Sequence, residues 1–99
     1  MKNIESEKSV EAFLKKSIEK DLKGRCIKML SAHMNGLPDR ICLIPGGKVF
    51  FAEVKTTNQK PRKIQLIVHR VLKNLGFRVE IIETKSRVKQ IVMEYANAE

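Results

Sequence analysis

Apolar and polar residues follow two different periods along the chain. The N-terminal segment has helical spacing, with apolar side chains at every fourth position: Val10, Leu14, Ile18 and Leu22, with Phe13 beside them. Gly24 follows this segment and is expected to end the helix. Residues 25–31 (RCIKMLS) alternate apolar and polar side chains, which predicts a short strand. Residues 32–38 are expected to form a loop.

The next segment has the composition of a β-hairpin. Residues 40–44 and 48–54 are rich in Ile, Val and Phe, and the Pro-Gly-Gly sequence at 45–47 favours a turn with positive φ. The apolar side chains of this hairpin are expected to lie in a core: Ile41, Leu43, Val49 and Phe51.

The length of the turn predicts the register of the hairpin. If Ile44 faces Lys48, then Asp39 lies opposite Glu53, with Cα atoms about 4.5 to 5.5 Å apart. Lys55 is two residues beyond Glu53 and therefore shares its face of the strand. The hairpin thus brings two acids and a lysine together.

The C-terminal part predicts two helices separated by a strand. Pro61 suits the first turn of a helix, and Gly76 is its expected C-cap. The expected core face of this helix is Ile64, Ile67, Val68, Val71 and Leu75. Residues 77–83 are predicted to form a strand, and Ser86 to cap a last short helix. That helix is expected to bury Val88, Ile91, Val92 and Tyr95.

The order αβββαβα predicts a mixed α/β fold in which helices flank a small sheet. With 99 residues, the chain is expected to form one domain, residues 1–99, around a single modest core. The formal charge of +9 favours a polyanionic partner such as nucleic acid over an acidic small molecule.

Cysteine and hydropathy patterns exclude several classes of protein. Cys26 and Cys42 lack the spacing of a zinc site or a disulfide framework, and are expected to be buried thiols in a reducing compartment. No stretch approaches the ~18 apolar residues of a membrane span, and residues 1–10 lack the apolar run of a signal segment. We therefore expect a protein of the cytoplasm or nucleoid that does not bind membranes.

Two carboxylates on facing strands repel each other unless a cation lies between them. Oxygen donors on a rigid sheet suit Mg²⁺ or Mn²⁺, which accept one or two carboxylates and complete their coordination with water and phosphate. Lys55 would then orient an attacking water or stabilise the phosphate. This combination predicts a site for phosphodiester hydrolysis. The alternative is that Asp39 caps a turn while Glu53 and Lys55 form an ordinary ion-paired face.

Residues 36–65, which include GLPDR, LIPGGKVFFAEVKT and KPRKIQ, resemble the motif string of the VRR-NUC family, the virus-type replication-repair nucleases of the PD-(D/E)xK superfamily. The resemblance implies a restriction-endonuclease-like core and a Mg²⁺- or Mn²⁺-dependent, structure-specific DNA endonuclease that works as a homodimer. Members of this length tend to be phage or prophage proteins. By this resemblance, the metal ligands are Asp39, Glu53 and the carbonyl of Val54, Lys55 is catalytic, and Gln65 supports the site.

The family also uses a glutamate of the first helix. Glu7 precedes Val10 by three residues, as in the family pattern, and helical periodicity directs it between Leu14 and Ile18. We therefore interpret Glu7 as the further metal ligand and catalytic acid, with Glu11 as the fallback. The alternative is a first-turn acid that complements the helix dipole.

Several basic residues are candidates for contact with DNA phosphates: Lys28, Lys48, Lys60, Arg62 and Lys63. Those at 60–63 open a helix, where backbone N–H groups also favour phosphate. With one tyrosine and no tryptophan, recognition of DNA through its phosphates and shape is expected rather than base stacking. His69 lies one turn after Gln65, and a structural role is expected for it.

The resulting hypothesis is an endonuclease for branched DNA that uses no small-molecule cofactor. Four-way (Holliday) junctions are the first expected substrate, because paired incision of a two-fold substrate suits a homodimer. Flaps and replication forks, with a partner protein that delivers the enzyme, are the next. The rival hypothesis is a nucleic-acid-binding module without catalysis.

Overall fold

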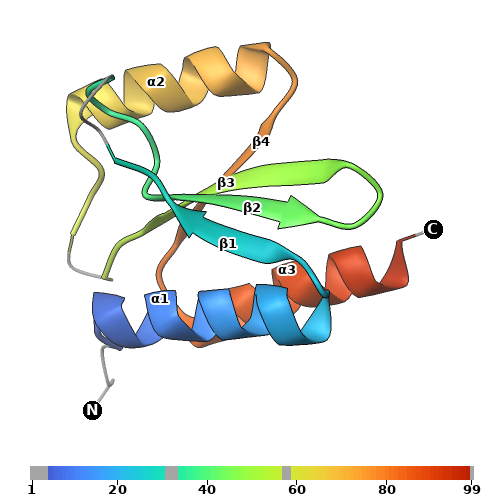
Figure 1. Cartoon of the computed structure of the whole chain (residues 1–99). Coiled ribbons are helices and arrows are strands. Elements are labelled where there is room, and N and C mark those ends of the chain that lie inside the picture. The colour runs from blue at the N-terminus through green and yellow to red at the C-terminus, as the bar shows by residue number, and fades with distance from the viewer. Residues whose placement is uncertain (1–4, 31–33, 57–58, 99) are drawn as a thin grey trace.

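The computed structural model describes residues 5–30, 34–56 and 59–98, and these confirm the predicted order of elements. In chain order they are α1 (Glu7–Lys16), a π-helical turn η1 (Ser17–Asp21), β1 (Arg25–Lys28), β2 (Arg40–Ile44), β3 (Lys48–Val54), α2 (Lys63–Asn74), β4 (Arg78–Ile82) and α3 (Lys85–Asn97). The sheet lies between α2 on one side and the pair α1 and α3 on the other (Figure 1). Within the described residues, no helix is long and apolar enough to cross a membrane.

The four strands lie in the order β1-β2-β3-β4. The pairs β1–β2 and β2–β3 are antiparallel, whereas β3 and β4 are parallel. A parallel pair needs a crossover connection, and α2 provides it. The result is the small mixed sheet flanked by helices that the sequence predicts.

The predicted register of the hairpin is confirmed. Ile44 pairs with Lys48, and the ladder continues to Arg40 and Ala52. Gly46 and Gly47 have φ of 91° and 76°, the left-handed conformation that the turn requires. The next position beyond this ladder places Asp39 opposite Glu53.

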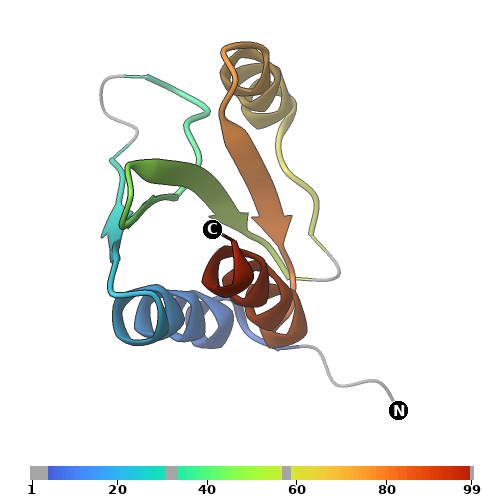
Figure 2. The same ribbon diagram turned by 90° about the vertical axis from the view of Figure 1, so that its right-hand side faces the viewer.

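The core lies on the face of the sheet that α1 and α3 cover, here called the core face (Figure 2). Alternation along the strands places Cys42, Ile44, Phe50, Ala52 and Val54 on this face. Side chains of α1 and α3 pack against them: Val10, Leu14, Val88, Ile91 and Val92. Tyr95 packs against this cluster and is only partly buried. The core face is therefore closed by two helices.

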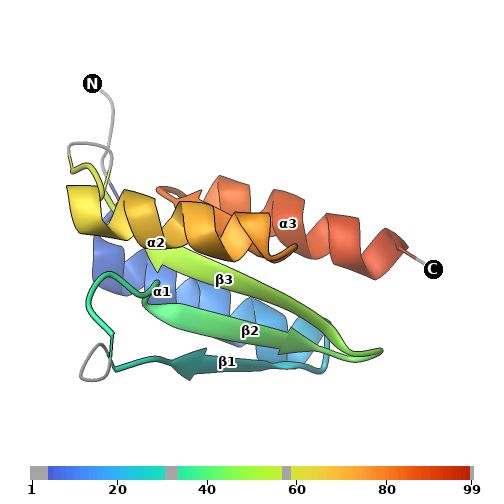
Figure 3. The ribbon, with the colours of Figure 1, turned by 90° about the horizontal axis from the view of Figure 1, so that it is seen from above.

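The opposite face, here called the α2 face, is covered only in part. Seen from above, α2 lies beside β3 and leaves β1 and β2 open (Figure 3). The expectation that Ile41, Leu43, Val49 and Phe51 all lie in the core is therefore wrong. Phe51 is buried, but Ile41 and Val49 are half-buried and Leu43 is exposed, because α2 does not extend over them (Figure 3).

The predicted core face of α2 is also wrong. Only Val68 of the predicted set is buried, together with Gln65 and His69. The apolar residues expected in the core are exposed instead: Ile64, Ile67, Val71 and Leu75. The helix buries Gln65, Val68 and His69, and an apolar stripe of the helix faces outward.

Three local boundaries differ from the prediction. The last helix begins at Lys85 rather than after Ser86, because the hydroxyl of Thr84 accepts a hydrogen bond from the Arg87 N–H at 3.1 Å and caps it. It spans 13 residues and is not short. The strand predicted over 25–31 ends at Lys28, and its last predicted residue lies outside the described part of the chain, as does the start of the predicted loop.

The expectation that Pro61 lies in the first turn of the second helix is wrong: it lies before α2, because Arg62 is the N-cap and the helix begins at Lys63. The expectations for the last strand, for Gly76 and for the cysteines are confirmed. The strand predicted over 77–83 is β4, one residue shorter at each end. Gly76 follows the C-cap of α2 with a φ of 97°. Cys26 and Cys42 are buried free thiols that face each other across β1 and β2, with their Sγ atoms 3.8 Å apart.

Candidate active site

One end of the sheet gathers the residues with candidate chemistry. There β2 begins, β3 ends, and both α1 and α2 begin (Figure 1). Because β2 and β3 are antiparallel, Asp39 just before β2 and Glu53 at the end of β3 meet at this edge. The main-chain N–H of Lys55 donates to the Ile82 carbonyl at 2.9 Å, which holds the end of β3 against β4.

Asp39 and Glu53 form a carboxylate pair on the α2 face. Glu53 is 1% exposed, and neither of its buried carboxylate oxygens accepts a hydrogen bond from the described residues. Burial, and after it the neighbouring Asp39 carboxylate, raise the pKa of Glu53 to about 7, against the opposing effects of Lys55 and Gln65. A buried acid without donors beside a second acid is costly, and a cation between them would relieve that cost.

Lys55 is the nearest positive charge to this pair. Its Nζ lies 3.4 Å from Oε2 of Glu53, an ion pair longer than a good hydrogen bond. The Lys55 side chain is 19% exposed, whereas that of Glu53 is 1% exposed. The ammonium therefore contacts Glu53 while it remains accessible from the end of the sheet.

Gln65 connects the carboxylates to the start of α2. Its Oε1 accepts a hydrogen bond from the Arg62 N–H at 2.8 Å, which caps the helix, and Gln65 is 4% exposed. The same side chain opposes the raised pKa of Glu53. Gln65 thus fixes the first turn of α2 next to the acid pair. Val54, between Glu53 and Lys55, is buried and pairs with Ile82.

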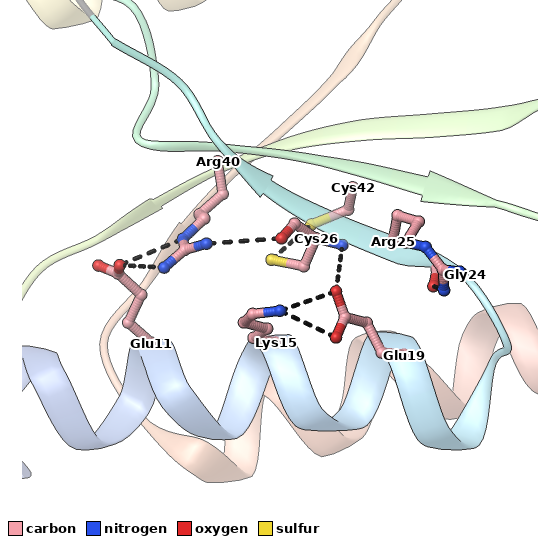
Figure 4. Close-up of polar contacts among 8 residues, drawn as sticks. All are labelled: Glu11, Lys15, Glu19, Gly24, Arg25, Cys26, Arg40 and Cys42. Atoms are coloured by element: carbon pink, nitrogen blue, oxygen red, sulfur yellow. Dashed lines mark hydrogen bonds and ion pairs between the residues drawn. The ribbon is translucent and has the colours of Figure 1, made fainter.

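The two candidate acids of α1 have different surroundings. Glu7 is the first residue of α1, and its Oε1 accepts a long hydrogen bond of 3.4 Å from the main-chain N–H of Thr56. Glu11 is ion-paired with Arg40 at 2.6 Å, and Arg40 also donates to the Cys26 carbonyl at 3.5 Å (Figure 4). Glu7 therefore lies at the end of β3, whereas Glu11 is already engaged by a cation.

A divalent cation fits the Asp39–Glu53 pair. Among the described residues, no three His, Cys, Asp or Glu side chains gather as a set of metal ligands, so Glu7 does not join the pair in this conformation. Mg²⁺ needs only one or two carboxylates, because water and substrate phosphate complete its octahedron. The donors are hard oxygens and both oxygens of Glu53 have no other hydrogen-bond partner, which matches that requirement.

The predicted DNA-binding residues fall into separate groups. Lys63 is the first residue of α2, Arg62 is its N-cap and Lys60 precedes them, and all three are exposed. Lys28 ends β1, and the residue after it, Met29, donates its N–H to the Asp39 carbonyl at 2.7 Å. Lys48 begins β3 at the other end of the hairpin, roughly 16 Å from Glu53 at 3.3 Å per residue.

A groove beside the site contains cations that sequence reasoning missed. It measures about 560 Å³ and is lined by Glu7, Lys8, Glu11, Ala12, Lys15, Lys28 and Arg40. Lys15 is paired with Glu19 at 2.9 Å (Figure 4). Within the described part of the chain, Lys8 and Lys28 are the groove cations without an ion pair. Lys8 follows Glu7 on α1, and the helical pattern alone carried no signal for it.

Comparisons with known proteins agree with this geometry. A solved structure described as a VRR_NUC domain superposes with a TM-score of 0.82 at 29% identity, covering 90% of this chain and 96% of that one. "Putative nuclease p44" of Acyrthosiphon pisum secondary endosymbiont phage 1 is 34% identical over 79 residues, covering 80% of this chain and 84% of that protein. No family model matches the chain.

The fold and the two relatives define a nuclease with a carboxylate pair and a lysine at the end of a β-hairpin. The chain belongs to the VRR-NUC family.

Proposed function

We propose that this protein is a Mg²⁺- or Mn²⁺-dependent endonuclease that hydrolyses phosphodiester bonds in branched DNA, with four-way junctions as its first substrate. The observation that carries the proposal is the buried acid Glu53, without hydrogen-bond donors, beside Asp39 and Lys55 at the open end of the sheet. The phage origin of one relative supports a role in a bacterial host.

Asp39, Glu53 and the carbonyl of Val54 are the proposed cation ligands, with Glu7 as a fourth once its side chain releases the Thr56 N–H. When bound, the divalent cation supplies charge neutralisation at the scissile phosphate and lowers the pKa of water. The proposed task of the protein is to hold the carboxylates in place, which the β2–β3 ladder does on a rigid hairpin.

Lys55 is the proposed catalytic lysine. Its ammonium lies on the accessible side of Glu53 and can donate to an attacking water or to a phosphate oxygen. Gln65 acts indirectly, because its amide keeps the start of α2 beside Glu53. Neither role requires a movement of the backbone.

DNA phosphates are proposed to bind on both sides of this site. Lys60, Arg62 and Lys63 lie at the start of α2, where backbone N–H groups also attract phosphate. Lys28 and Lys8 lie on the other side, in the groove along α1. Contacts of this kind position the duplex without reading its sequence, which suits an enzyme that recognises DNA shape.

A homodimer is proposed to form through the exposed apolar stripe of α2, Ile64, Ile67, Val71 and Leu75. These side chains are 37%, 52%, 46% and 69% exposed, and their spacing puts them on one side of the helix. A second copy would bury them in a self-complementary contact. Two sites related by a two-fold axis would then match the two-fold symmetry of a four-way junction.

The test compares cleavage of labelled four-way, flapped, forked and linear DNA with and without Mg²⁺. The proposal expects Mg²⁺-dependent cleavage, fastest on the four-way junction. Lys55→Ala should lower single-turnover cleavage by about 10² to 10³-fold, the scale of losing one preorganised donor at the phosphate. Lys20→Ala, at an exposed position of η1, is the matched control and should cleave like the parent.

The outcomes separate the competing functions. Binding of junctions without cleavage in any metal would leave only a nucleic-acid-binding module. Faster cleavage of flaps or forks than of four-way junctions would support the nuclease function and contradict four-way junctions as its first substrate. Light scattering of Ile67→Glu, which charges the α2 stripe, should show the monomer mass. A parent protein that is monomeric with and without junction DNA would contradict the paired-incision model.

A further inference from the structure

His69 is a buried polar residue that the proposed mechanism does not use. It lies on α2, is 3% exposed, and its Nε2 has no hydrogen-bond partner among the described residues. In that part of the chain, the other buried side-chain atoms without a partner are the two carboxylate oxygens of Glu53. The unsatisfied polar atoms therefore belong to the candidate site and to His69.

The position of His69 on α2 directs it toward the carboxylates. Gln65 and His69 are four residues apart, so they share the side of α2 that faces the sheet. The Gln65 side chain opposes the raised pKa of Glu53, and the negative charge of Asp39 opposes the lowered pKa of His69. Burial and the nearby Lys73 lower the pKa of His69. A neutral imidazole has one N–H donor and one acceptor nitrogen.

A purely structural histidine does not account for this placement. A buried nitrogen without a partner costs stability, and an apolar side chain of similar size would pack there without that cost. The Asp39 carboxylate, for its part, interacts with the Glu53 carboxyl and accepts no hydrogen bond from an N–H group of the described residues. Carboxylates that bind a metal normally receive a hydrogen bond that fixes which oxygen faces the ion. His69 offers a buried N–H donor on the side of α2 that faces the sheet.

We infer that His69 is a positioning residue, whose Nε2–H donates to the Asp39 carboxylate when a divalent cation occupies the site. This hydrogen bond orients one Asp39 oxygen toward the cation and satisfies the imidazole at the same time. The inference rests on the proposed cation site and adds to it a residue that the motif does not contain. It predicts that His69 lowers the stability of the metal-free protein and raises its affinity for the cation.

Two variants separate positioning from packing. His69→Leu removes the donor and keeps much of the volume, whereas His69→Gln keeps an N–H group near the position of Nε2. Mn²⁺ affinity is measured by calorimetry, unfolding by urea in EDTA, and junction binding by electrophoretic shift in EDTA. Val68→Ala is the matched control, since Val68 is the adjacent buried residue of α2 and carries no donor.

The inference expects His69→Leu to unfold at the same or a higher urea concentration than the parent, and to bind Mn²⁺ about 10 to 100-fold more weakly. His69→Gln should recover most of that affinity, Val68→Ala should lose stability alone, and junction binding in EDTA should be unchanged throughout. Parent-like Mn²⁺ affinity in His69→Leu would overturn the inference and leave the cation site standing. Equal loss in folded His69→Gln and His69→Leu would overturn it as well. A parent protein that binds no Mn²⁺ would overturn the cation site and this inference together.

Discussion

The two faces of the sheet differ in burial and in polarity. On the core face, Cys42, Phe50 and Ala52 are fully buried under α1 and α3 and belong to one hydrophobic cluster. On the α2 face, the same strands carry Glu53, which is as buried as these residues but has no hydrogen-bond partner among the described residues, and Leu43, which is exposed. One helix covers this face only in part (Figure 3).

The difference indicates that one face of the sheet stabilises the fold and the other carries the candidate site. The core face supplies the hydrophobic burial that stabilises the fold. The α2 face holds charged groups whose burial is unfavourable until a ligand binds, as is common at functional sites. Alternation along β3 places Ala52 and Val54 on one face and Glu53 and Lys55 on the other, so adjacent residues serve different purposes.

The largest expected effect comes from the core face. Phe50→Ala should lower the free energy of unfolding by about 3 to 5 kcal/mol, because Phe50 is fully buried and its ring stacks on Tyr95 with centroids 5.5 Å apart. Leu43→Ala, on the open part of the α2 face, should cost less than about 1 kcal/mol. Urea unfolding measures both. Equal costs would show that the two faces contribute alike.

The next effect is a pH dependence from the α2 face. The pKa of Glu53 rises from 4.5 to about 7 on folding, so the unfolded chain ionises at lower pH than the folded one. The stability of the metal-free protein should therefore decline between pH 4.5 and pH 7, by on the order of 3 kcal/mol, and this contribution should be constant above that range. Glu53→Gln should remove this decline in urea unfolding with EDTA. An unchanged pH profile in the variant would assign the decline to other groups.

A smaller effect distinguishes the two acids of α1. Glu11→Gln breaks the ion pair with Arg40 and should cost about 1 kcal/mol of stability without changing Mn²⁺ affinity. Glu7→Gln should leave stability within about 0.5 kcal/mol and weaken Mn²⁺ binding about 10-fold. Calorimetry measures the Mn²⁺ affinity of both variants, and urea unfolding measures their stability. The reverse pattern would make Glu11 the fourth ligand.

The smallest effect concerns the basic residues at the start of α2. The logarithm of junction affinity should fall with the logarithm of salt concentration by about 0.9 per phosphate contact on a duplex. Arg62→Ala with Lys63→Ala should reduce this slope by about 2, and Lys20→Ala, at an exposed position of η1, should leave it unchanged. A double variant with the parent slope would remove Arg62 and Lys63 from the interface.

Much of the fold could be predicted because its signals are local. The Pro-Gly-Gly turn specifies the register, and the register alone brings Asp39 opposite Glu53. The rotation of α2 could not be predicted, since its apolar stripe, which includes Ile67 and Val71, looks like any core-facing stripe. A sequence pattern does not show that the buried side carries Gln65 and His69, because their partners come from another part of the chain.

The roles of individual site residues were harder to predict than the fold. The motif indicates Glu53 and Lys55 directly, and their contact at 3.4 Å follows from alternation along one strand. The choice between Glu7 and Glu11 depends on what each meets in three dimensions, the Thr56 N–H or the Arg40 guanidinium. The periodicity of α1 contains no information about either partner.

Titration of Mn²⁺ into the parent protein and into Asp39→Asn tests most directly whether the α2 face is a cation site. We expect saturable binding to the parent, and affinity at least about 10-fold weaker in Asp39→Asn, which removes one carboxylate charge but keeps the shape of the side chain. Asp21→Asn, at an exposed position at the end of η1, is the charge-matched control and should bind like the parent. Equal Mn²⁺ affinity in the parent and Asp39→Asn would contradict the assignment of Asp39 and Glu53 as the cation site.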